Sequence, residues 1–300
     1  MLACTYTTSR CMFGAYFESR ILNLVSNHFF EKNDEYGEIP IFQPIFNPTP
    51  NSSADMAATY PPYLQLSRMG IDNIWSLVHD NSNLVESLVD LDLYDNMIKD
   101  ISPVSLLTNL ENLNLNSNKV THITAIAGLT KLRVLEIDSN DIVDISPISH
   151  LKNLEEITLA ANECIVGIAA LASLTKLTQV SLANCGVRDI TSLAGLTGMR
   201  LLSLAINKIT DVTPLSGMTS LECLNLERNK ITDVTPLSGM TSLTCLNLDE
   251  NEITDISPIA TLTSLKRFNV IYEKVINLTP LSMLMRQIVD FEWDGLYYDY

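Results

Sequence analysis

The chain has 300 residues and a formal net charge of −16 at pH 7. Such an acidic chain repels the phosphate backbone of nucleic acids, so we expect no nucleic-acid partner. The sequence contains no run of about 18 apolar residues, so we predict no membrane-spanning helix.

Residues 1–60 show no internal repeat and are predicted to form an N-terminal extension. The apolar residues between Phe17 and Phe30 have the spacing of an amphipathic helix, and the six prolines in residues 38–62 indicate an extended linker. The first twenty residues include no sustained apolar segment, so we predict no secretory signal. This favours a cytoplasmic location, whereas a misassigned start site would leave an extracellular or surface location open.

A repeat of 22 residues fills the rest of the chain. The fifteen residues 207–221 recur letter for letter at 229–243. The same phase marks a series of inward asparagines, with Cys185 one residue late and Glu273 at its end: Asn96, Asn118, Asn140, Asn162, Asn207, Asn229 and Asn251. We predict a repeat domain over residues 61–296, with degenerate first and last repeats and a tail at 297–300.

Each repeat contains a short strand followed by a compact turn. Leu110, Leu113 and Leu115 show the spacing, in which alternate residues point into the core. The second half has an apolar residue every three positions and a pair such as Thr213-Pro214, which we interpret as a capping residue and the first residue of a 3₁₀ turn. The predicted fold is an α/β right-handed solenoid with a parallel concave sheet of nine or ten strands and irregular convex segments.

Two further positions of the repeat carry polar side chains. We expect the inward asparagines to form a ladder of hydrogen bonds with the backbone of neighbouring turns. An aspartate recurs four residues after the ladder position, and we expect these residues to cap local turns rather than bind calcium: Asp100, Asp144, Asp189, Asp211, Asp233 and Asp255.

The concave columns supply the predicted partner-binding residues. The N-terminal end is acidic with one aromatic residue: Asp90, Asp92, Tyr94, Glu136, Asp138 and Glu156. The middle is small and apolar: Ala160, Ala183, Leu201, Ala205 and Ile206. The C-terminal end mixes charges: Glu227, Arg228 and Asp249. We expect a protein partner with a basic patch over the acids and apolar contacts in the middle; the alternative is that the acids only maintain solubility.

The sequence offers little for catalysis. The four histidines are scattered, and neither a nucleophile motif nor a phosphate-binding loop occurs, so we predict a non-enzyme without a cofactor or metal. Cys223 and Cys245 are one repeat apart and are expected to be neighbours on adjacent strands. Two separate thiols are the favoured interpretation, and a bridge or a metal pair is the alternative.

The repeat unit, with Ile209-Thr-Asp-Val-Thr-Pro-Leu215 followed by a Thr-Ser-Leu segment, resembles the internalin-like leucine-rich repeats of bacterial surface proteins. The segment Leu91-Asp-Leu-Tyr-Asp-Asn-Met-Ile98 resembles the SDS22 type, a regulatory subunit of protein phosphatase 1. We predict a non-catalytic protein-interaction module that is monomeric on its own. The resemblance leaves two functions open, a phosphatase-type regulatory subunit and an internalin-like surface adhesion protein.

Overall fold

The computed structural model describes residues 63–79 and 82–270, the single positions 275, 279 and 282, and the backbone of 290–292. The side chains of residues 82–84 are not described. The predictions for the extension at 1–60, for Glu273 and for the tail at 297–300 lie outside these residues.

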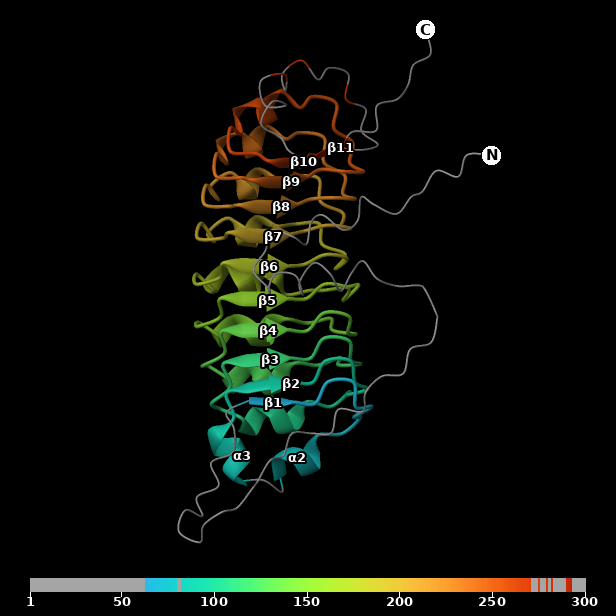
Figure 1. Cartoon of the computed structure of the whole chain (residues 1–300), viewed down its shortest axis with the longest axis vertical. Coiled ribbons are helices and arrows are strands. Elements are labelled where there is room, and N and C mark those ends of the chain that lie inside the picture. Colours follow the sequence, from blue (N-terminus) through green and yellow to red (C-terminus); the bar gives the residue numbers. More distant parts are fainter. Residues whose placement is uncertain are drawn as a thin grey trace, which may run out of the picture. The chain divides into compact units, whose positions relative to one another are not determined.

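The strands form one parallel sheet that follows the order of the chain (Figure 1). Neighbouring strands pair in register, so the central leucines of successive repeats, such as Leu91 and Leu113, lie side by side. The eleven described strands are β1 (Tyr63–Gln65), β2 (Asp90–Asp92), β3 (Asn112–Asn114), β4 (Val134–Glu136), β5 (Glu156–Thr158), β6 (Gln179–Ser181), β7 (Leu201–Ser203), β8 (Cys223–Asn225), β9 (Cys245–Asn247), β10 (Arg267–Asn269) and β11 (Asp290–Glu292). The predicted solenoid with a parallel sheet is confirmed, and the described sheet has eleven strands rather than the nine or ten expected, because both β1 and β11 extend it at its ends.

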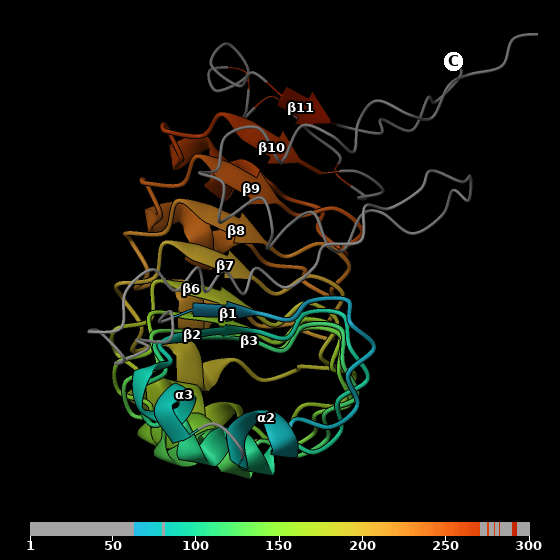
Figure 2. The same ribbon diagram turned by 60° about the horizontal axis from the view of Figure 1, so that its bottom comes forward.

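Short 3₁₀ turns lie opposite the sheet, and two short helices lie at its N-terminal end (Figure 2). The helices α2 (Trp75–His79) and α3 (Ser82–Ser87) fill the first repeat, which is longer than the others. The described 3₁₀ turns are η2 (Ser102–Leu106), η3 (Thr124–Gly128), η4 (Ser146–His150), η5 (Ile168–Ser173), η6 (Thr191–Leu193), η7 (Thr213–Leu215), η8 (Thr235–Gly239) and η9 (Ser257–Thr261).

The core is a continuous column of aliphatic side chains between the sheet and the turns. In the repeat that contains β3, Leu110, Leu113 and Leu115 are at most 1% exposed, as their spacing predicts. Phe268 of β10 is fully buried in the same core. Because each repeat buries its leucines only against the next, the stack depends on neighbouring repeats rather than on distant contacts.

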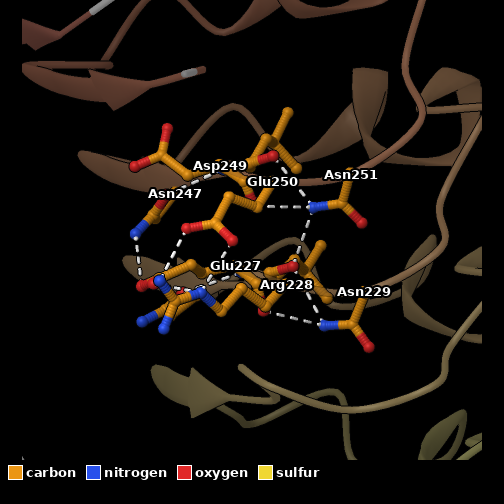
Figure 3. Close-up of polar contacts among 10 residues, drawn as sticks. Glu227, Arg228, Asn229, Asn247, Asp249, Glu250 and Asn251 are labelled. Atoms are coloured by element: carbon orange, nitrogen blue, oxygen red, sulfur yellow. Dashed lines mark hydrogen bonds and ion pairs between the residues drawn. The ribbon is translucent and has the colours of Figure 1, made fainter. Parts of the chain in front are cut away.

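The asparagine ladder is present, and Asn229 shows its contacts. Its Nδ2 group donates to the carbonyl of Leu204 in the preceding repeat at 2.9 Å. The same group donates to Leu226 and Glu227 of its own repeat at 2.9 and 3.2 Å. Its Oδ1 atom accepts the amide hydrogen of Ile209, again in the preceding repeat, at 3.0 Å. Each rung therefore satisfies backbone groups of two repeats. Figure 3 shows the two neighbouring rungs Asn229 and Asn251.

The aspartates cap the turns, but the expected caps by serine and threonine are wrong. The turn η7 begins at Thr213, with Val212 at the N-cap position. The amide of Thr213 donates to Oδ1 of Asp211 at 2.8 Å. Hydrogen bonds from the hydroxyl and the amide of Thr213 lower the pKa of Asp211. The aspartate side chain accepts from the amide two residues later. Thr213 is therefore the first residue of the turn and not the capping residue before it. Five other turns carry the same bond, from Ser102, Ser146, Thr191, Thr235 and Ser257 to the aspartate two residues before.

Cys185 replaces an asparagine of the ladder, at the rung that follows the one-residue insertion. The Cys185 thiol donates to the carbonyls of Leu159 at 3.1 Å and Ala183 at 3.5 Å, which replaces the donor of an asparagine. Burial raises the pKa of Cys185 to about 12, so the sulfur keeps its proton. A thiol is a poor acceptor, but the amide of Ile165 donates to the Cys185 carbonyl at 3.2 Å instead. The cysteine therefore suits a rung where the backbone itself supplies the acceptor.

Gly167, in the inserted segment, adopts a φ of +81° at the N-cap of η5. A Cβ atom there would lie 2.9 Å from Oδ1 of Asp144 and 3.1 Å from the amide nitrogen of Ser146. We expect Gly167→Ala to lower the free energy of unfolding by about 1–3 kcal/mol, because it adds backbone strain and disturbs the cap of η4. Urea unfolding tests this. Gly128→Ala is the matched control, since no atom lies within 4 Å of its Cβ position. Equal effects of the two substitutions would contradict the prediction.

Candidate partner-binding surface

The strand residues on either side of each central leucine face away from the core. In β2, Asp90 and Asp92 are half-buried while Leu91 is fully buried. Register pairing places Asp90 beside Asn112 and Asp92 beside Asn114, and the same alignment continues through β10. The structure thus brings the predicted binding residues of the strands into continuous columns on one face.

The acidic end of this face is supported by the first repeat. Asp92 accepts hydrogen bonds from the hydroxyl of Ser67 at 2.8 Å and from the amide of Tyr94 at 2.9 Å. The guanidinium of Arg68 lies 5.3 Å from the centroid of the Tyr94 ring and 3.3 Å from Asp95. Arg68 was not predicted as a site residue, because the weak first repeat gave no phase to place it beside Tyr94. Tyr94 is therefore held by a cation–π contact at the edge of the acidic end.

Ion pairs neutralise several arginines beside the columns. Arg133 lies between two glutamates, 2.9 Å from Glu155 and 3.9 Å from Glu111. Arg228 and Glu250 approach to 2.7 Å, and Arg228 also lies 3.7 Å from Glu227 (Figure 3). These pairs are exposed and add little stability individually. Their effect is electrostatic, because the paired glutamates neutralise the positive charges of the arginines that lie next to the acidic columns.

Asp138 is not an exposed acid. Its side chain is 8% exposed, and its Oδ1 atom accepts the amide hydrogen of Ala160 at 2.6 Å. Asn116, one repeat earlier, accepts the amide of Asp138 in the same way at 2.6 Å. Burial raises the pKa of Asp138 to about 7, and the charge of Glu136 adds to the rise. Asp138 therefore acts first as a link between repeats, and its assignment to the binding surface stays a prediction.

The apolar middle is a buried cluster with a partly exposed rim. Ala160, Ala183 and Ala205 are only 5–7% exposed and pack together, with Ile206 against them. Their low exposure follows from the packing of the three small side chains against one another and against Ile206, and their assignment to the binding surface stays a prediction. Leu201 and Ile206 are half-buried and remain accessible. A partner would meet these two residues, with the alanines as support.

Ile206 also has an unusual backbone. Its φ is +56°, whereas the equivalent positions hold Asp95, Ser117, Ser139, Ala161, Asn184, Arg228 and Glu250. A β-branched residue is seldom found in this left-handed region, so the packing of the repeat must hold Ile206 there. The strain places an aliphatic side chain where other repeats present mainly polar ones.

Cys223 and Cys245 are paired in register on β8 and β9, as expected. Neither is in a disulfide. A shallow depression of about 400 Å³ lies elsewhere, between the inserted repeat and the next one, lined by residues 165–169, 186–189, Thr191 and Ser192. The sequence did not predict this depression, whose lining includes Gly167 and Gly186, both with positive φ.

Comparison with known proteins agrees with this geometry. Two leucine-rich repeat families match the sequence, one described as two copies of the repeat over residues 197–239 and one over residues 86–142. An internalin, InlF of Listeria monocytogenes, is 31% identical, with a TM-score of 0.65 over 77% of this chain and 74% of that protein. Internalin C2 of the same organism is 28% identical, with a TM-score of 0.53 over 70% of this chain and 82% of its own.

The chain therefore belongs to the leucine-rich repeat proteins. These are in general protein-interaction modules and are typically non-catalytic scaffolds. The ectodomain of the Arabidopsis thaliana receptor kinase GASSHO1/SCHENGEN3, solved in complex with Casparian Strip Integrity Factor 2, shares the fold. It is 24% identical, with a TM-score of 0.60 over 71% of this chain and 27% of that one. No curated protein sequence matches the chain.

Within the described residues, no helix is both long and apolar enough to span a membrane. The same part of the chain brings together no group of three or more histidine, cysteine, aspartate or glutamate side chains suited to a metal ion.

Proposed function

We propose that this protein is a non-catalytic recognition module that binds a protein partner across the concave face, as an internalin-like protein would. The likeness to two internalins supports this choice, and no reported match supports a phosphatase-type regulatory subunit. The likeness also weakens the expected cytoplasmic location, because internalin-like repeats are typical of surface proteins. The expectation of a monomer stays a prediction.

The charge of the concave columns carries the proposal. Asp90, Asp92, Glu136, Glu156 and Glu227 all lie on the columns and are half-buried rather than fully solvated. Among the described strand residues, Arg267 of β10 is the positively charged member of the columns. A concave surface of one sign concentrates potential, so the partner should present a basic patch and associate faster at low ionic strength.

Leu201 and Ile206 would form the dry part of the contact. Ile206 packs against the buried alanines, and Leu201 of β7 is half-buried like Ile206. Apolar side chains surrounded by polar ones are typical of the energetic centre of an interface, where water is excluded. Tyr94 and Arg228 would lie at the rim, together with Asp249.

A charge-reversal experiment tests this proposal. The double variant Glu136→Lys with Glu156→Lys should lose partners captured from native extract by the wild type. Reversing the exposed Asp141 and Glu163, which lie beyond the strands, changes net charge equally and is the matched control. Quantitative mass spectrometry should show the same proteins retained by the control and lost by the concave variant. If both double variants capture the wild-type set, the concave face is not the binding surface.

A further inference from the structure

Two thiols lie side by side on the concave face, separately from the acidic end. Cys223 is half-buried on β8, and Cys245 is 7% exposed on β9. The strands pair Cys223 directly with Cys245. The thiol of Cys223 is hydrogen-bonded to that of Cys245, and the hydroxyl of Thr244 lies 3.9 Å from the Cys245 sulfur. The fold thus presents two sulfur atoms in one direction from adjacent repeats.

We propose that Cys223 and Cys245 form a binding site for a single soft, two-coordinate metal ion of the copper(I) class, held as a sulfur–metal–sulfur bridge between β8 and β9. This site is independent of the proposed partner-binding function.

The strand spacing favours a bridging ion over a disulfide. Paired residues on adjacent strands are roughly 4.8 Å apart, and side chains in register run parallel. A disulfide needs Cβ atoms roughly 3.8 Å apart, so the two strands would have to approach or the side chains twist. Two metal–sulfur bonds of roughly 2.3 Å arranged in line span about 4.6 Å. An ion between the sulfurs therefore requires less distortion of the sheet than a disulfide does.

The ligand set selects the class of metal. Around this pair, the described residues supply no third histidine, cysteine or carboxylate suited to the same ion. Structural zinc is bound by four ligands, so two sulfurs alone do not complete its site. Thiolates are soft ligands that favour copper(I), which accepts low coordination numbers. Two thiolates without a further ligand thus match a monovalent soft ion.

The surroundings keep the Cys223 thiol protonated and unreactive when no metal ion is bound. Hydrogen bonding to Cys245 and burial raise the pKa of Cys223, and the nearby Glu222 adds to the rise. The Cys223 thiol therefore keeps its proton at neutral pH, unlike redox-active cysteines. Copper(I) displaces the thiol protons on binding: one copper(I) ion and two thiols give a bis-thiolate with a single negative charge, and two protons pass to water. Arg267 is paired with Cys245 on β10 and would offset part of that charge.

Titration with copper(I) tests the proposal. The full-length chain with Cys4→Ser, Cys11→Ser and Cys164→Ser keeps the pair and the ladder residue Cys185. Anaerobic competition against a chromogenic copper(I) chelator should show one ion bound per chain. Adding Cys223→Ser or Cys245→Ser to this background should weaken binding at least about 100-fold, because each removes a direct ligand, and outer contacts alone are worth 10–100-fold. Circular dichroism confirms that each variant is folded.

Two results would overturn the proposal. One is unchanged copper(I) affinity in both folded serine variants. The other is binding of less than one copper(I) ion per two chains by the triple serine variant that keeps Cys223 and Cys245. Cys185→Ala in the same background is the matched control. Copper(I) binding should be unaffected in this variant, because the Cys185 thiol lies on the inner ladder. Loss of binding in that folded variant would assign the ion to Cys185 instead.

Discussion

Asn229→Ala is expected to lower the free energy of unfolding by about 2–6 kcal/mol. The substitution leaves the amide of Ile209 and the carbonyl of Leu204 without the side chain that now binds them. Asn229 is only 7% exposed, so water does not readily replace these bonds, and each unsatisfied buried group costs about 1–3 kcal/mol. Urea unfolding followed by circular dichroism measures the loss.

Cys185→Ala is the matched control for that experiment. It removes only a thiol donor, because the amide of Ile165 is already bound to the Cys185 carbonyl. We expect a loss of about 1–3 kcal/mol, clearly smaller than for Asn229. Losses of equal size at both positions would show that the ladder stabilises the stack through packing rather than through hydrogen bonds.

Asp138→Asn is expected to stabilise the protein above pH 7 and to flatten its pH dependence. Burial holds the pKa of Asp138 at about 7 in the folded chain, against the ordinary aspartate value of 3.8. Near pH 4 and below, both folded and unfolded chains hold the proton. Between these values only the folded chain holds it, so stability falls as the pH rises from about 4 to about 7. One pKa unit corresponds to about 1.4 kcal/mol, which sets an upper limit of about 4 kcal/mol.

The asparagine fits this position because Asn116 already makes the equivalent bond one repeat earlier. Urea unfolding at pH 5 and pH 8 measures the effect, and the exposed Asp141→Asn controls for loss of one charge. The wild type should lose more stability than Asp138→Asn between these pH values. The same slope for both proteins would mean that Asp138 ionises in the folded state as it does in the unfolded chain.

The repeat allowed most of the fold to be predicted from the sequence. A period of 22 residues fixes which leucines face the core and which asparagines form the ladder, since every repeat makes the same contacts with its neighbour. The helices α2 and α3 were not predicted, because they lie in an insertion without that period. The predicted caps were wrong: serine or threonine was expected to cap each turn, whereas it is the first residue of the turn and the aspartate two residues earlier binds its amide. Both residue types are common caps, so the sequence does not distinguish them.

The candidate surface was less predictable than the fold. The phase identifies the columns, but it does not give the exposure of their members. Asp138 and Ala183 occupy the same column as Glu227, yet they are buried while Glu227 is half-buried. That difference depends on side-chain length and on bonds across repeats, such as the bond from the Ala160 amide to Asp138. The partner-binding residues themselves stay a prediction.

The ladder has a direction that matters while the chain is being made. Asn229 binds the amide of Ile209 and the carbonyl of Leu204, and both belong to the repeat that precedes it. A repeat leaving the ribosome thus has interior backbone groups that wait for the next asparagine, about 22 residues later. At 5–20 residues per second, translation supplies that asparagine after roughly 1–4 s. Each newly synthesised repeat therefore completes the one before it, and the youngest repeat is always the one exposed to misfolding or to a chaperone.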